Sequence, residues 1–121
     1  MKRYRRAFTL VELMMVIAII SVLFAIAAPN IVTAREKTRS RGCIGNLKTI
    51  DSTKEQYGID NRLSAGSTMP ALSALCGAGT TTYIKGGQPA CPAGGAYTLN
   101  NLGTNPTCSV GSSAPVAHVL P

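Results

Sequence analysis

A long apolar run near the N-terminus constrains the fold of this chain more than any other feature. It extends from Phe8 to Ala28 and contains only three polar residues, Thr9, Glu12 and Ser21. As an α-helix, a segment of this length would be about 32 Å long, close to the roughly 30 Å hydrocarbon thickness of a bilayer. We therefore predict a helix over residues 8–28 that is able to span a membrane.

The rest of the 121-residue chain allows one small domain, which excludes a multidomain enzyme or a polytopic transporter. Residues 62–121 hold nine of the 12 Gly and six of the seven Pro, so we expect many loops in this half. The chain has no Trp and only two Phe. Its core should therefore be thin and should need covalent or intermolecular reinforcement.

The net charge of +7 is concentrated in two basic clusters that flank the apolar run. The first contains Lys2, Arg3, Arg5 and Arg6, and the second contains Arg35, Lys37, Arg39 and Arg41. Basic residues in such positions are typical of membrane-flanking charge. Membrane lipid is therefore the expected partner, with nucleic acid as the disfavoured alternative.

An ordinary secretory signal peptide, with Ala25, Ala27 and Ala28 at its cleavage site, is the alternative interpretation. The run is longer than a signal core of roughly 7 to 15 residues, and it carries Glu12. A carboxylate at membrane depth costs at least a few kcal/mol without a partner. No Lys, Arg or His lies within the run. Glu12 therefore either stays hydrated at the headgroup level or pairs with another chain or with a charge created by processing.

The start of the chain combines basic Met1–Arg6, then Ala7, then Phe8-Thr9-Leu10-Val11-Glu12 at the head of the apolar run. This pattern resembles the prepilin leader of type IV pilins and pseudopilins. The resemblance implies that a membrane peptidase cuts between Ala7 and Phe8 and N-methylates Phe8. Glu12 then neutralises the new α-amine of a neighbouring subunit during assembly. Ala7 departs from the usual Gly of the family, but it is the next smallest residue, so we expect cleavage to survive.

The resemblance also implies a domain plan and a location. A leader over 1–7 precedes a membrane-spanning and polymerisation helix over 8–28, an amphipathic continuation over 29–61 and a C-terminal pilin domain over 62–121. The chain is expected to cross the inner membrane once, with its N-terminus in the cytoplasm, and then to enter a periplasmic or cell-surface filament. The implied partners are identical or homologous subunits, the prepilin peptidase, an inner-membrane assembly platform and lipid.

Pro29 follows the apolar run, where it removes a backbone donor and predicts a kink or local melting of the helix. A Pro here is common in pilins and is associated with loosening of the helix inside the filament. No further Pro occurs before residue 58. Apolar residues recur there at helical spacing, which predicts a second, amphipathic half-helix whose buried stripe contains Cys43, Leu47, Ile50 and Tyr57. Gly58 or Asn61 would end it.

The sequence of residues 62–121 predicts only short helices and strands. A helical turn is expected over Ala71–Leu75, and strands over Tyr83–Lys85, Ala96–Leu99 and Thr107–Val110. A two- or three-stranded antiparallel sheet packed on the helical stripe would bury both surfaces. The predicted fold class is therefore α+β, with a long N-terminal helix packed on a small antiparallel sheet, which is the layout of pilins.

Scattered residues from position 42 onward resemble the major competence-type and type II secretion pseudopilins, among them Gly42-Cys43, Asn46-Leu47, Tyr83-Ile84-Lys85 and Cys91-Pro92. The secretion-type members usually bind calcium in an acid-rich C-terminal loop. Residues 62–121 contain no Asp or Glu, so we expect no calcium site. No cofactor is expected.

Four cysteines, Cys43, Cys76, Cys91 and Cys108, admit three full disulfide pairings, and export would favour their oxidation. The family resemblance favours Cys43 with Cys91, which leaves Cys76 with Cys108. Zinc held by three cysteines and His118 is the alternative. The absence of a C-x-x-C knuckle and the irregular spacing of the cysteines disfavour it, so we predict no metal and interpret His118 as a tail residue.

These features predict a structural subunit, a pilin or major pseudopilin, that polymerises through its N-terminal helix into a type IV pilus-like, competence or type II secretion filament. The alternative is a monomeric membrane-anchored or signal-peptide-cleaved exported binding protein. Glu12 beside a prepilin cleavage motif favours the first. An enzyme is not expected, because the single His118 lies near the chain end and no pairing of nucleophile and base is evident.

Overall fold

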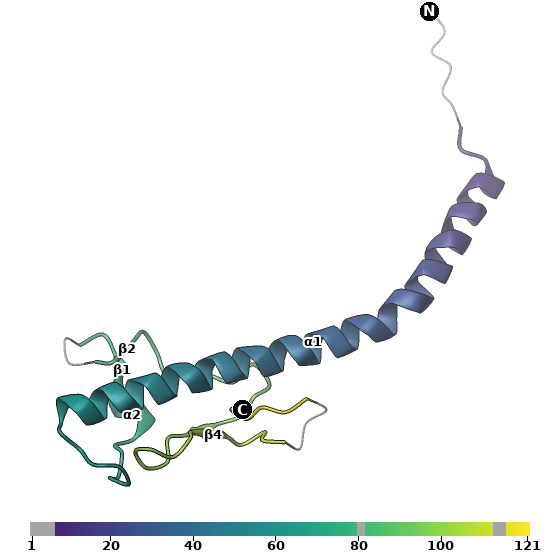
Figure 1. Cartoon of the computed structure of the whole chain (residues 1–121). Coiled ribbons are helices and arrows are strands. Elements are labelled where there is room, and N and C mark those ends of the chain that lie inside the picture. Colours follow the sequence, from purple (N-terminus) through teal and green to yellow (C-terminus); the bar gives the residue numbers. More distant parts are fainter. Residues whose placement is uncertain (1–6, 80–81, 113–115) are drawn as a thin grey trace, which may run out of the picture. The chain divides into compact units, whose positions relative to one another are not determined.

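A computed structural model describes residues 7–79, 82–112 and 116–121 of the chain. The basic leader residues 1–6 lie outside the described residues. The chain divides into two compact units, Met1–Arg35 and Glu36–Pro121, which are described separately. The longest element is helix α1, Leu10–Asp60 (Figure 1). It is followed by α2 (Leu72–Leu75), β1 (Cys76–Gly77), β2 (Ile84–Lys85), β3 (Tyr97–Thr98) and β4 (Thr107–Cys108).

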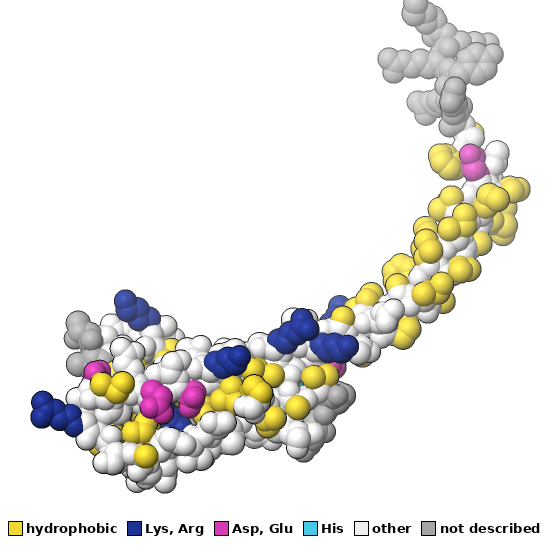
Figure 2. Space-filling view, viewed as in Figure 1, with side chains coloured by type: hydrophobic (Ala, Val, Ile, Leu, Met, Phe, Trp, Pro, Cys, Tyr) yellow, Lys and Arg dark blue, Asp and Glu magenta, His cyan; other side chains and the backbone are white. Residues whose placement is uncertain are grey.

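The first unit is the N-terminal part of α1, and its side chains have no core to pack into. The large hydrophobic residues between Phe8 and Val32 are 46–80% exposed. Figure 2 shows these hydrophobic side chains covering the N-terminal part of the helix. By length and composition, this part of α1 is apolar enough to cross a membrane.

Helix α1 continues through Pro29 without a break, so the local melting predicted there does not occur in this structure. Pro29 has no backbone N–H. The helix therefore lacks one hydrogen bond, the one that this N–H would donate to the carbonyl four residues earlier. The Thr33 hydroxyl, one turn later, donates to the Pro29 carbonyl at 3.4 Å. One missing bond in a 51-residue helix is therefore tolerated.

Helix α1 ends at Asp60, directly before Asn61, so of the two predicted stops the helix passes through Gly58 and stops at Asn61. Arg62 adopts a left-handed conformation with φ of 53°. Its N–H donates to the Ile59 carbonyl at 3.2 Å, and the Leu63 N–H donates to the Gly58 carbonyl at 2.8 Å. These two bonds form a Schellman motif, which satisfies carbonyls that the end of the helix would otherwise leave free.

The second unit packs the predicted stripe of α1 against the rest of the domain. Cys43, Leu47 and Ile50 are fully buried, which confirms the helical periodicity. Tyr57 is half-buried, and its ring meets that of Tyr83 edge to face at a centroid distance of 5.5 Å. Burial of this stripe, rather than helix propensity, is what holds this part of α1 in place.

The core of this unit consists of two clusters along the helix. The first cluster joins Cys43 and Leu47 to Cys91 and Cys108. The second cluster joins Ile50 to Leu72, Leu75 and Leu99. Tyr97 packs against both, so its ring links the two halves of a core that contains few large residues.

Two short strand pairs complete the second unit. β3 and β4 pair antiparallel, with Tyr97 opposite Cys108, which confirms the predicted hairpin and the α+β fold. β2 pairs in parallel with β1, with Ile84 opposite Cys76. The sequence predicted a strand near Ile84 but not its partner, because a two-residue Cys-Gly strand shows no alternating pattern.

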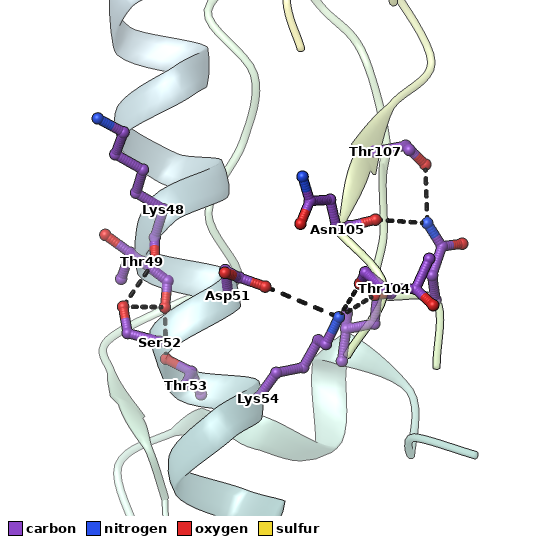
Figure 3. Close-up of polar contacts among 11 residues, drawn as sticks. Lys48, Thr49, Asp51, Ser52, Thr53, Lys54, Thr104, Asn105 and Thr107 are labelled. Atoms are coloured by element: carbon purple, nitrogen blue, oxygen red, sulfur yellow. Dashed lines mark hydrogen bonds and ion pairs between the residues drawn. The ribbon is translucent and has the colours of Figure 1, made fainter. Parts of the chain in front are cut away.

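Lys54 is fully buried on the inner face of α1 (Figure 3). Its Nζ donates to the Leu99 carbonyl at 3.0 Å and to the Thr104 carbonyl, and it lies 3.8 Å from the Asp51 carboxylate. Burial lowers the pKa of Lys54, whereas Asp51 raises it. The ammonium group thus fastens the loop between β3 and β4 to the helix.

Candidate functional site

The predicted processing and assembly residues lie at the start of α1. Ala7 and Phe8 precede the helix and are exposed, Phe8 by 80%. Thr9 and Glu12 form a capping box. The Glu12 N–H donates to Thr9 Oγ1 at 3.2 Å, while Glu12 Oε2 accepts longer bonds from the Thr9 hydroxyl at 3.4 Å and the Thr9 N–H at 3.5 Å.

The charge of Glu12 has no cationic partner within the described part of the chain. The ion pairs there join Arg39 to Glu36 at 3.1 Å and Lys54 to Asp51 at 3.8 Å. The capping bonds of Glu12 use one carboxylate oxygen, Oε2. The geometry therefore leaves an exposed negative charge at the head of an apolar helix, where a cation from outside the chain can reach it.

The structure brings three of the predicted disulfide residues together. Cys43 on α1, Cys91 in the turn before β3 and Cys108 on β4 meet His118 from the C-terminal tail. The ligand atoms of these four buried residues all lie within 4.8 Å of one another. Cys91 Sγ and His118 Nδ1 are 3.7 Å apart. We call these four residues the Cys–His cluster.

Cys76 does not belong to the Cys–His cluster. It packs in the second part of the core, beside the cluster formed by Ile50, Leu72, Leu75 and Leu99. The structure therefore does not place Cys76 against Cys108, which lies in the first part. All four cysteines are free thiols in the structure, and the disulfide pairing stays a prediction.

The cysteines of the Cys–His cluster differ in acidity. Burial raises the pKa of Cys43 to about 12. Burial also acts to raise the pKa of Cys91, but the N–H groups of Ala93 and Gly95, together with Cys43 and His118, outweigh it and lower this pKa to about 6. Of Cys43 and Cys91, Cys91 is therefore the thiol that ionises at the lower pH.

A glycine turn shapes the surroundings of Cys91. The Gly94 N–H donates to the Cys91 carbonyl at 2.9 Å, and Gly94 has a φ of 81° that favours glycine. A Cβ atom on Gly95 would lie 2.6 Å from Cys108 Sγ. The two glycines thus allow the chain to turn back and its backbone to approach Cys108 closely.

The C-terminal tail is held against the domain by hydrogen bonds. The Ser40 hydroxyl donates to the Ala117 carbonyl at 2.5 Å, and the His118 N–H donates to the Gly111 carbonyl at 2.9 Å. His118 is only 1% exposed, so its interpretation as a tail residue without a structural role is wrong. No local sequence pattern marks it, because its neighbours in space come from positions 43, 91 and 108.

Comparison with known proteins gives consistent matches. Residues 2–28 match the prokaryotic N-terminal methylation motif. The chain is 30% identical to the type II secretion system core protein G of Escherichia coli (strain K12), over 92% of this chain and 82% of that protein. It is 31% identical to the type IV wide pilus major component PilA4 of Thermus thermophilus, over 89% and 73% of the two chains.

A further match covers half of the chain. The chain is 37% identical to the competence protein ComGC of Streptococcus pneumoniae over 60 residues, which are 50% of this chain and 56% of that protein. No solved structure gives a significant match.

Proposed function

Because this chain belongs to the type IV pilin and pseudopilin family, we propose that it is a structural subunit that polymerises through the N-terminal part of α1 into a filament. The observation that carries the proposal is the exposed apolar surface of this helix, with the single charge of Glu12 near its start. A lone carboxylate on a membrane-depth helix calls for a partner from outside the chain.

Processing supplies that partner in our proposal. Cleavage between Ala7 and Phe8 creates an α-amine on Phe8, which is then methylated. Both residues lie before the first helical residue, so a peptidase can bind them in extended form without unwinding α1. The new amine of one subunit would then pair with Glu12 of its neighbour, while the apolar side chains of the two helices pack together.

The proposed topology follows from the charges at the helix ends. The leader with its basic residues stays in the cytoplasm, α1 crosses the inner membrane once, and the second unit is exported. The basic residues after Pro29 oppose this orientation, but they begin six positions beyond it. The prepilin peptidase and an inner-membrane assembly platform are the proposed processing and assembly partners.

The relatives belong to secretion, pilus and competence systems, so the filament type is set by the machinery that accompanies this chain. A monomeric anchored binding protein is the competing function. It gives Glu12 no partner and leaves the methylation motif unused.

The decisive experiment separates filaments from membranes. Cells that express the full-length chain with its own assembly machinery are sheared, and the chain is quantified in the sheared and membrane fractions. A structural subunit appears in the sheared fraction in processed form, and deletion of the assembly ATPase moves it back to the membrane. A chain that stays in the membrane fraction of cells that do produce filaments would establish the monomeric anchored protein instead.

A further inference from the structure

We propose that the Cys–His cluster is a structural zinc site, in which Cys43, Cys91, Cys108 and His118 supply the four ligands. The proposal concerns the second unit alone and does not depend on filament assembly. Three thiolates and one imidazole are among the donor sets that structural zinc sites use, and such sites are closed by four protein ligands. The four ligand atoms are already within 4.8 Å of one another.

The geometry is close to that of a zinc tetrahedron. With Zn–S bonds of about 2.3 Å and a Zn–N bond of about 2.0 Å, the ligand atoms of such a site are roughly 3.5–3.8 Å apart. Cys91 Sγ and His118 Nδ1 are 3.7 Å apart, within that range. The widest separation in the cluster is 4.8 Å or less, so a contraction of about 1 Å would complete the coordination sphere.

The number of thiols also favours a metal over a disulfide. Three cysteines meet in the cluster, and the fourth, Cys76, packs in the other part of the core. A disulfide within the cluster would leave one buried thiol over, beside an imidazole nitrogen that a disulfide does not use. A zinc ion uses all three sulfur atoms and the nitrogen.

The burial of the four ligands fits a closed structural site. Three thiolates, a neutral imidazole and Zn²⁺ sum to one negative charge, and metal binding releases the thiol protons. The four ligand residues are at most 6% exposed, so water is largely excluded.

The ion would connect four segments that are far apart in the sequence. It would join α1, the turn at Cys91, β4 and the tail at His118. The first core cluster contains only one large aliphatic residue, Leu47, among its buried members. Zinc would therefore supply the reinforcement that this thin core lacks.

The test uses the untagged full-length chain, purified in detergent under zinc-replete and reducing conditions, with zinc counted by mass spectrometry. We expect about one zinc ion per chain, and close to none in Cys91→Ser and His118→Ala. Cys76→Ser is the matched control, since it removes the cysteine outside the cluster and should keep the ion. Cobalt in place of zinc should give the intense visible bands of a tetrahedral thiolate site.

A second measurement on the unaltered chain covers the case in which the ligand variants fail to fold. Alkylation without unfolding should modify Cys76 first, and a chelator should make the other three cysteines react at least about tenfold faster. The proposal is overturned by a chain that binds no zinc, by a chelator without effect on alkylation, or by equal zinc in all variants. A disulfide within the cluster in protein freshly isolated from cells would overturn it as well.

Discussion

The Glu12 carboxylate accepts hydrogen bonds from the Thr9 hydroxyl at 3.4 Å and the Thr9 N–H at 3.5 Å, so the residue proposed to bind a neighbouring amine also caps its own helix. A change at Glu12 therefore alters two properties at once, the stability of the first turn of α1 and the charge offered to another subunit. Thr9 provides the means to separate them, because it contributes to the cap and carries no charge.

Glu12→Ala should leave cleavage and membrane insertion intact and reduce incorporation into filaments by two to three orders of magnitude. Leaving a buried charge unpaired costs about 3 to 5 kcal/mol, and each 1.4 kcal/mol is about tenfold. Thr9→Ala is the control, since it loses a cap worth about 1 kcal/mol but keeps the carboxylate. Shearing followed by immunoblotting measures both. Equal losses in the two variants would assign the effect to the cap rather than to the charge.

The mature chain should begin at Phe8 and carry a methylated amino group. The match over residues 2–28 to the methylation motif and the position of Ala7 before the helix are the grounds for this prediction. Intact-mass measurement of the membrane-extracted chain determines both the N-terminal residue and its methylation. Ala7→Gly should be processed at least as completely. A terminus near Ala28 would instead support an ordinary signal peptide.

Lys54→Met should lower the free energy of unfolding by about 1 to 3 kcal/mol, because it leaves the carbonyls of Leu99 and Thr104 without their donor. Lys48→Met is the matched control on the same helix, since Lys48 is exposed and its loss should change stability by less than about 0.5 kcal/mol. Urea unfolding of the full-length chain in detergent compares them. Equal effects in the two variants would show that the buried ammonium contributes nothing specific.

Two glycines of α1 should respond to alanine in opposite directions. Gly45 is exposed and a Cβ there meets nothing within 4 Å, so Gly45→Ala should stabilise the helix by up to about 1 kcal/mol. A Cβ on Gly58 would lie 2.7 Å from Leu102 Cδ2, so Gly58→Ala should destabilise by about 1 to 3 kcal/mol. Thermal unfolding of both variants measures the two changes in stability. A stabilised Gly58→Ala would mean that Leu102 moves aside freely.

The elements that the sequence predicted correctly depend on local periodicity. Cys43, Leu47 and Ile50 recur at helical spacing, and the strands around Tyr97 and Thr107 flank a turn-rich loop. Lys54 lies four residues after Ile50 and belongs to the same buried face. It was missed because a charged side chain is read as exposed unless its partners are known, and those partners are backbone carbonyls about 45 to 50 residues away.

For a related reason, zinc held by three cysteines and His118 was only a disfavoured alternative in the sequence. Zinc sites are recognised in sequences by closely spaced ligand pairs, and no such pair exists here. The ligands of this cluster come from a helix, a turn, a strand and a tail, and only the fold brings them within 4.8 Å. The position of Cys76 outside the cluster likewise depends on packing that the spacing of the cysteines does not encode.

The buried ammonium of Lys54 gives the loop between β3 and β4 a cation that belongs to the chain itself. A loop closed by a dissociable metal ion opens when the ion becomes scarce, because its occupancy follows the free concentration by mass action. Lys54 is present in every copy at a fixed one-to-one ratio and cannot be diluted away. A scarcity of divalent metal ions should therefore not remove this contact between the loop and the helix.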